Sequence, residues 1–301
     1  MQPELKLGMV GLDTSHSIAF ADLLHSPQHP FHVPGGRIVG AYPGGSRDFP
    51  ASIDRVDGFT KTIREQFGVE IVDSPEAVAE RCDAVLLVTG DVRRHLEQFR
   101  RIAPAGKPVF IDKPFAVSTT DARQMVALAG AHAVPLLTCS PLRYAEALQT
   151  ALADTAAGAV IGADFYGPMH LEPTQPGLFW YGIHAVEMLY ATLGAGCREV
   201  SAVTAADHDV ATGRWADGRL GVVRGNRKGN GKFGGLIHRE KATTFVDALA
   251  HPKPFYASLV ERIMQMFRTR IAPIPLEESV ELVRFIEAAN ESRSTGKPVA
   301  L

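Results

Sequence analysis

The chain has 301 residues, of which 46% are hydrophobic and 21% charged, and its net charge is −2. Its length predicts about two domains, and its apolar content excludes a disordered protein. A charge this balanced provides no electrostatic field that would attract nucleic acid or anionic lipid. We therefore expect small-molecule chemistry or protein partners, with no nucleic acid and no membrane.

The start of the chain and the cysteines predict a cytoplasmic location. Residues 1–6, MQPELK, lack the basic start and apolar run of a signal peptide, and no apolar stretch approaches the roughly 20 residues that span a bilayer. Cys82, Cys139 and Cys197 lie far apart and form no CxxC pair. We therefore expect buried free thiols in a reducing compartment.

The first half of the chain alternates short apolar runs with amphipathic segments, which is typical of βαβ units. The expected strands are residues 5–10, 37–41, 69–72, 84–88, 108–111 and 135–138. The expected helices are residues 17–24, 60–67, 75–81, 93–102 and 120–131. This pattern predicts an α/β domain with a Rossmann-type doubly wound parallel sheet over residues 1–140.

The second half has a different pattern, in which successive strands follow one another with Gly-rich turns. The expected helices are residues 145–153, 182–193, 256–268 and 276–292, and the expected strands are one after Gly158 and residues 200–205, 219–224 and 233–238. This order predicts an α+β domain with a mostly antiparallel open sheet over residues 141–301.

The loop after the first strand resembles a degraded dinucleotide-binding loop. The pattern G-x-G-x-x-G lets a pyrophosphate approach the backbone and a helix N-terminus, and here Gly11 is retained while Asp13 and His16 replace the later glycines. We expect the Thr14 and Ser15 hydroxyls to take over the phosphate contacts. A carboxylate repels phosphate, so Asp13→Gly is expected to raise cofactor affinity. Alternatively, Asp13 and Ser15 cap the helix that follows.

The second strand leads into Ser46 and Arg47, with no acidic residue directly at its end to hold a ribose. A guanidinium matches a 2′-phosphate well, so these two residues are candidates for the adenosine end of NAD or NADP. A plain surface turn is the alternative.

Two further positions carry groups suited to acid–base chemistry. Lys113 follows the fifth strand, at the edge where parallel sheets bind ligands, and burial there would lower its pKa. His184 shares a helix face with Glu187, three residues later. A structural role in helix packing is the alternative for His184.

Taken together, the chain resembles the Gfo/Idh/MocA family of sugar and polyol oxidoreductases. The matching positions are the first loop, His95, residues 106–108 leading into 112–114, Arg143 with Tyr144, residues 182–184, and the C-terminal residues 275–299. The first loop, with sequence GLDTSH, suggests a dehydrogenase subgroup within this family. The resemblance implies an NAD- or NADP-binding Rossmann domain, and a second domain whose open sheet makes a homodimer or homotetramer.

The resemblance also implies roles for particular residues. Lys113 and His184 would be the catalytic acid–base residues, facing one pocket. Cofactor contacts would come from Gly11, Asp13, Thr14, Ser15, His16, Ser46, Arg47, Thr89, His95 and Asp112. Substrate contacts would come from Arg143, Tyr144, Glu172, Trp180, Tyr181 and Glu187. Trp180 replaces the Asp that the family has four residues before its catalytic His, which leaves Glu187 as the nearest carboxylate.

The sequence therefore predicts an NAD(P)-dependent oxidoreductase acting on a carbohydrate-like hydroxy compound. The departures keep two alternatives open: a lyase, epimerase or glycoside-cleaving enzyme of the same fold, and a non-catalytic ligand-binding protein. No metal is expected, although Asp13, His16 and His95 together have the ligand types for one.

Overall fold

The computed structural model describes residues 3–301, which form two compact units. The first unit comprises residues up to Ala116, Thr120–Thr138 and Tyr256–Leu276, and the second comprises Val117–Thr119, Cys139–Phe255 and Glu277–Leu301. The chain passes from the first unit to most of the second between residues 138 and 139, where the sequence placed the boundary at residue 140. Residues 256–276 return to the first unit, which the sequence did not indicate.

The first unit contains a six-stranded sheet in the order β3-β2-β1-β4-β5-β6. The strands are β1 Leu5–Val10, β2 Gly36–Tyr42, β3 Glu70–Ile71, β4 Ala84–Leu87, β5 Val109–Ile111 and β6 Leu136–Thr138. All neighbouring pairs are parallel, and Val10 at the end of β1 pairs with Tyr42 on one side and Leu87 on the other. The strand order reverses between β1 and β4, where such sheets bind their ligands.

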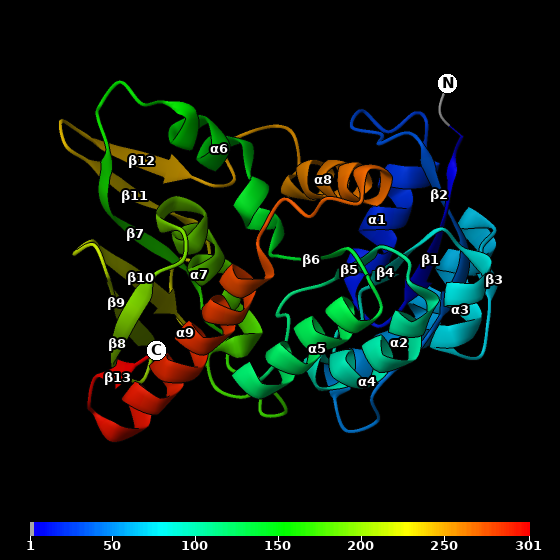
Figure 1. The fold of residues 1–301 in the computed structure, drawn as a ribbon, viewed down its shortest axis with the longest axis horizontal. Helices are drawn as coiled ribbons and strands as arrows, with labels where there is room; N and C mark the ends of the chain where they lie inside the picture. The colour runs from blue at the N-terminus through cyan, green and yellow to red at the C-terminus, as the bar shows by residue number, and fades with distance from the viewer. Residues whose placement is uncertain (1–2) are drawn as a thin grey trace. The chain divides into compact units, whose positions relative to one another are not determined.

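Helices cover this sheet, so its central strands are apolar on both faces. The helices are α1 Ser15–His25, α2 Pro50–Phe67, α3 Pro75–Arg81, α4 His95–Ile102, α5 Thr119–Ala131 and α8 Phe255–Thr269. Helix α2 begins ten residues before its expected start, because Pro50 in its first turn is a helix-start signal. Helix α8 lies beside α1 (Figure 1), where the Tyr256 ring packs against Phe20.

The second unit contains a seven-stranded sheet in the order β12-β11-β7-β10-β9-β8-β13. The strands are β7 Val160–Pro168, β8 Cys197–Thr204, β9 His208–Trp215, β10 Leu220–Asn226, β11 Gly234–Arg239, β12 Thr243–Asp247 and β13 Val299–Ala300. Strands β7 and β10 pair in parallel and the other neighbours are antiparallel. The predicted fold class is confirmed. Strands β9 and β12 were not predicted, because their outward positions are largely polar.

Helices pack against one face of this second sheet. They are α6 Glu146–Ala153, α7 Phe179–Leu193 and α9 Leu276–Thr295. Trp215 of β9 packs there against Tyr190 of α7 and Phe285 of α9, whereas Leu236 of β11 and Phe245 of β12 remain exposed. Within residues 3–301, no helix combines the length and the apolarity that crossing a membrane requires.

Candidate active site

The loop after β1 is held close to the loop after β4. Gly11 has φ of 92°, and a Cβ at this position would lie 2.3 Å from the Thr89 Cα atom. Only glycine tolerates both this backbone conformation and this approach. The retained glycine therefore brings the two loops together at the carboxyl edge of the sheet, where the predicted cofactor residues Gly11 and Thr89 both lie.

Asp13 is fully buried and its carboxylate accepts two hydrogen bonds. The Ser52 hydroxyl donates to one oxygen at 2.6 Å, and the Gly90 backbone N–H donates to the other at 2.7 Å. Asp13 therefore ties the first loop to the start of α2 and to the loop after β4. The alternative that Asp13 and Ser15 cap α1 is wrong: Thr14 is the N-cap, and its hydroxyl accepts from the His16 N–H at 3.4 Å.

The N-terminus of α1 has the properties of a phosphate site. Its first turn contains no acidic residue, Ser15 is exposed, and backbone N–H groups at a helix start attract anions. Nearby on the same sheet edge, the Asp112 Oδ1 atom is buried without a hydrogen-bond partner among the described residues. It is an acceptor that a ligand's N–H or O–H can satisfy. These residues fit a dinucleotide.

His16 stands between Asp112 and a residue from the far end of the chain. Its Nδ1 atom lies 2.5 Å from Asp112 Oδ2, and its Nε2 atom lies 2.9 Å from the Tyr256 hydroxyl. His16 and Asp112 are buried. Tyr256 was not identified from the sequence, because no local pattern links residue 256 to the first loop.

Lys113 directly follows Asp112 and is half-buried. Burial lowers the pKa of Lys113, the carboxylate of Asp112 opposes this shift, and the charge of Arg55 adds to it, so the pKa lies below its ordinary value. Burial by itself would raise the pKa of Asp112. This effect is outweighed by the charge and hydrogen bond of His16 and by the charge of Lys113, so the pKa of Asp112 lies below its ordinary value. The pKa of Lys113 is thus closer to neutral pH than the pKa of a surface lysine.

Ser46 and Arg47 line a cavity of about 370 Å³ at the end of β2. Arg93 lies on the same cavity, where its guanidinium donates two hydrogen bonds to the Asp48 carboxylate, at 2.8 and 2.9 Å. Asp48 was not expected from the sequence because it lies six residues beyond the strand. The Asp48 carboxylate is paired with Arg93. Arg47 contributes a further cation to the lining of the cavity.

His95 bridges two backbone segments at this edge. Its ring nitrogens lie 3.1 Å from the Phe115 carbonyl and 2.9 Å from the Thr89 carbonyl. His16 and Asp13 have the other partners described above. Among residues 3–301 no three His, Cys, Asp or Glu side chains gather as a metal site would require.

In the second unit, His184 lies on α7 with its Nδ1 atom 2.7 Å from the Ser140 hydroxyl. The rings of Tyr181 and Phe233 contact it edge-on, with centroids 5.7 and 5.3 Å away. Ser140 also connects His184 to Glu187, because its backbone N–H donates to the Glu187 carboxylate at 2.9 Å. Glu187 is therefore connected to His184 through Ser140, and its carboxylate accepts hydrogen bonds from the Ser140 N–H and from Arg143.

Arg143 lies between two carboxylates of this unit. It donates to Glu187 and, at 2.6 Å, to Glu278, and Tyr144 next to it is buried. Trp180 and Tyr181 are half-buried at the start of α7. Glu172 accepts hydrogen bonds from the backbone N–H and the hydroxyl of Thr174. Substrate contacts by these residues stay predictions.

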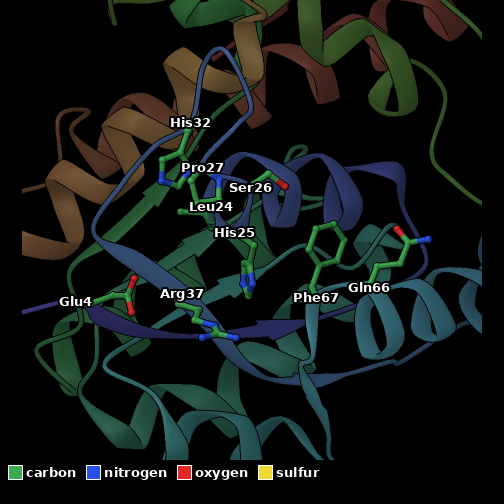
Figure 2. Close-up of a pocket in the computed structure, with 9 residues that line it drawn as sticks. All are labelled: Glu4, Leu24, His25, Ser26, Pro27, His32, Arg37, Gln66 and Phe67. Carbon is green, nitrogen blue, oxygen red and sulfur yellow. The ribbon is translucent and has the colours of Figure 1, made fainter.

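Another cavity, of about 400 Å³, lies at the opposite edge of the first sheet and contains none of the predicted site residues. Figure 2 shows His25, from the end of α1, between Arg37 of β2 and Phe67 of α2. The cavity lies at the amino ends of β1 and β2, away from the edge where parallel sheets bind cofactors.

Comparison with known proteins identifies the first unit. The sequence model of the "Oxidoreductase family, NAD-binding Rossmann fold", Gfo/Idh/MocA, matches residues 7–138. The resemblance inferred from the sequence is thus confirmed, together with the oxidoreductase class and, for the expected NAD or NADP, an NAD-binding Rossmann fold. The GLDTSH subgroup stays a prediction. No curated protein sequence matches the chain.

Solved structures share the whole fold at low sequence identity. Scyllo-inositol dehydrogenase from Lactobacillus casei, with bound NAD(H) and scyllo-inositol, is 15% identical, with 99% of each chain covered and a TM-score of 0.80. Myo-inositol 2-dehydrogenase from Lactobacillus plantarum is 15% identical, with 100% of each chain covered and a TM-score of 0.79. An oxidoreductase from Agrobacterium radiobacter, in complex with NAD+, L-tartaric acid and magnesium, is 18% identical, with 99% of this chain and 98% of that chain covered and a TM-score of 0.76.

Proposed function

Because residues 7–138 belong to the Gfo/Idh/MocA oxidoreductases, we propose that the chain is a dehydrogenase or reductase of a sugar, a polyol or a related hydroxy compound. The single observation that carries this proposal is the carboxyl edge of the first sheet. There, a glycine loop and a helix N-terminus follow β1, and an unsatisfied Asp112 oxygen and a lysine of lowered pKa follow β5. The inositols bound or named in similar folds favour a polyol.

We propose that Gly11, Thr14 and Ser15 hold the pyrophosphate with the N-terminus of α1. Ser46 and Arg47 would receive the adenosine ribose or its 2′-phosphate, so the cavity they line accommodates NAD or NADP. Asp112 Oδ1 would accept from a donor on the cofactor or substrate. The bound nicotinamide supplies the hydride chemistry.

In this proposal Lys113 and His184 are the acid–base catalysts. The Lys113 ammonium donates a hydrogen bond to the reacting oxygen, which stabilises negative charge on it. His184, whose Nδ1 atom lies 2.7 Å from the Ser140 hydroxyl, would accept the proton that an alcohol loses on oxidation. Trp180 and Tyr181 would form an apolar wall for the substrate, and Arg143, Tyr144, Glu172 and Glu187 are candidates for its hydroxyl or carboxylate groups.

Replacement of Lys113 and of His184 by alanine tests this assignment. We expect each variant to lower turnover by about 10²–10⁴ while cofactor affinity changes little. The two losses should not add in the double variant, because groups that serve one proton transfer act as a unit. The measurements are nicotinamide reduction with a panel of inositols and sugar acids, and NAD binding by calorimetry.

Lys61→Ala and His251→Ala, at exposed positions, are the matched controls and should retain turnover. Full turnover per folded molecule in His184→Ala, with a lowered melting temperature, would assign His184 to helix packing instead.

Trp180 favours a second candidate, because it stands where the family has an acid. A lyase, epimerase or glycoside-cleaving enzyme of this fold would return its cofactor unchanged. Product formation with no net change in nicotinamide absorbance would identify that class, whereas tight binding with no product would indicate a ligand-binding protein.

A further inference from the structure

Three side chains at the carboxyl edge of the first sheet form a hydrogen-bonded chain. Asp112 lies 2.5 Å from His16, and the other ring nitrogen of His16 lies 2.9 Å from the Tyr256 hydroxyl. The imidazole also packs edge-on against the Tyr256 ring, with centroids 4.9 Å apart. Residues 16, 112 and 256 come from α1, the end of β5 and the start of α8, so the tertiary fold assembles this group.

The arrangement fixes the direction of the Asp112 carboxylate. Two tautomers of His16 exist, but only one with a proton on Nδ1 donates to an ionised Asp112. Nε2 then accepts from the Tyr256 hydroxyl, or donates to it when the ring is charged. Either way, Oδ2 is held by His16 while the buried Oδ1 has no partner among the described residues.

Asp112 is the charged neighbour that favours the Lys113 ammonium. Burial and the charge of Arg55 from α2 lower the pKa of Lys113, whereas the charge of Asp112 raises it. Loss of His16 would raise the pKa of Asp112, because burial penalises the charged carboxylate and the charge and hydrogen bond of His16 are the main causes that oppose this. A protonated Asp112 would no longer provide a negative charge beside the Lys113 ammonium.

We propose that His16 and Tyr256 are positioning residues that keep Asp112 ionised, so that Asp112 maintains the ammonium form of Lys113. His16 acts directly on Asp112, and Tyr256 acts by holding the His16 ring. The consequence for turnover rests on the proposed catalytic role of Lys113, whereas the effect on the amine itself does not.

The experiment measures the Lys113 amine without any turnover. The full-length protein is acylated briefly with acetic anhydride from about pH 6 to about pH 10, around the ordinary lysine range, and modification of Lys113 is quantified by mass spectrometry. Only the free amine reacts, so the rate at fixed pH reports the loss of the ammonium.

Asp112→Asn should raise the labelling rate of Lys113 near neutral pH roughly tenfold, because one opposite charge is lost. His16→Leu should raise it in the same direction. His16→Asn should restore a rate near that of the unchanged protein, since the Asn side-chain N–H stands close to where Nδ1 donates. Tyr256→Phe should have a smaller effect than His16→Leu.

His25→Gln, at the other end of the same helix, is the matched control and should leave the rate unchanged. Equal rates in His16→Leu, His16→Asn and the unchanged protein would overturn the proposal and assign the group to packing alone. Because no substrate is present, failure of the dehydrogenase assignment would leave these rates untouched, so the two failures are distinguishable. Thermal unfolding of each variant shows that the labelled protein is folded.

Discussion

Asp13 illustrates how a residue's partners decide its role. On spacing alone, its carboxylate stands beside a phosphate and repels it. In the structure the carboxylate is fully buried and accepts from Ser52 and Gly90, so it stabilises the loops that form the cofactor edge. The residue replaces a glycine of the usual pattern and takes on a structural task.

The consequence reverses the expectation for Asp13→Gly. Both Asp13→Gly and Asp13→Ala should lower the free energy of unfolding by about 2–3 kcal/mol, because a buried hydroxyl and a buried N–H lose their acceptor. NAD affinity should fall or stay constant, as calorimetry on the folded variants would measure. Asp57→Ala, at an exposed position of α2, is the control. A tenfold tighter binding of NAD by Asp13→Gly would restore the repulsion hypothesis.

The two ends of helix α1 carry polar groups with different roles, backbone donors at its start and the hydrogen-bond acceptor His25 at its end. Its first turn presents N–H groups toward the cofactor edge, while its last residue, His25, accepts the Ile38 N–H of β2 at 3.0 Å. The His25 ring also contacts the Phe67 ring at the end of α2 (Figure 2). Burial, and then the charge of Arg37, lower the pKa of His25 from 6.5 to about 4.

This lowered pKa predicts a loss of stability in weak acid. Below about pH 6.5 the unfolded chain binds a proton at His25 that the folded chain does not bind. The contribution of His25 to the free energy of unfolding is therefore complete above pH 6.5 and is lost as the pH falls toward 4. With a half-buried ring the loss should be about 1–2 kcal/mol. Urea unfolding at several pH values measures it.

His25→Gln should remove this part of the pH dependence, because its amide oxygen can still accept the Ile38 N–H without titrating in this range. The exposed His251→Gln is the control. An unchanged pH profile in His25→Gln would show that another group causes the acid sensitivity.

At the scale of the whole molecule, one face of the second sheet carries no helix within residues 3–301. It exposes Val203, Leu220, Leu236 and Phe245 on four strands, and Leu236 and Phe245 are direct partners across β11 and β12. Exposed apolar side chains that gather on one face mark interaction sites. We propose that this face pairs with a second copy of the chain in a homodimer or homotetramer.

Phe245→Glu should therefore reduce the mass in solution toward that of one chain, because an interface buries its apolar centre away from charge. Light scattering after size-exclusion chromatography measures this mass. Ile271→Glu places the same charge on an exposed apolar position of the first unit and should leave the mass unchanged. An oligomer that persists in Phe245→Glu would exclude this face as the interface.

The sequence by itself determined the parallel sheet, the position of Lys113 and the family of residues 7–138, because strand periodicity, the glycine at position 11 and short motifs are local features. It also indicated most of the second domain, but it did not show β9 or β12, whose outward positions are largely polar. Only the tertiary structure decided the partners of Asp13, His16 and His184. Ser52, Tyr256 and Ser140 lie far from them along the chain, and hydrogen bonds over such separations leave no periodic signal. The return of residues 256–276 to the first unit was likewise decided by packing. Helix α8 has the pattern of an ordinary amphipathic helix, and only its contacts with α1 and with residues 35–36 assign it to that unit.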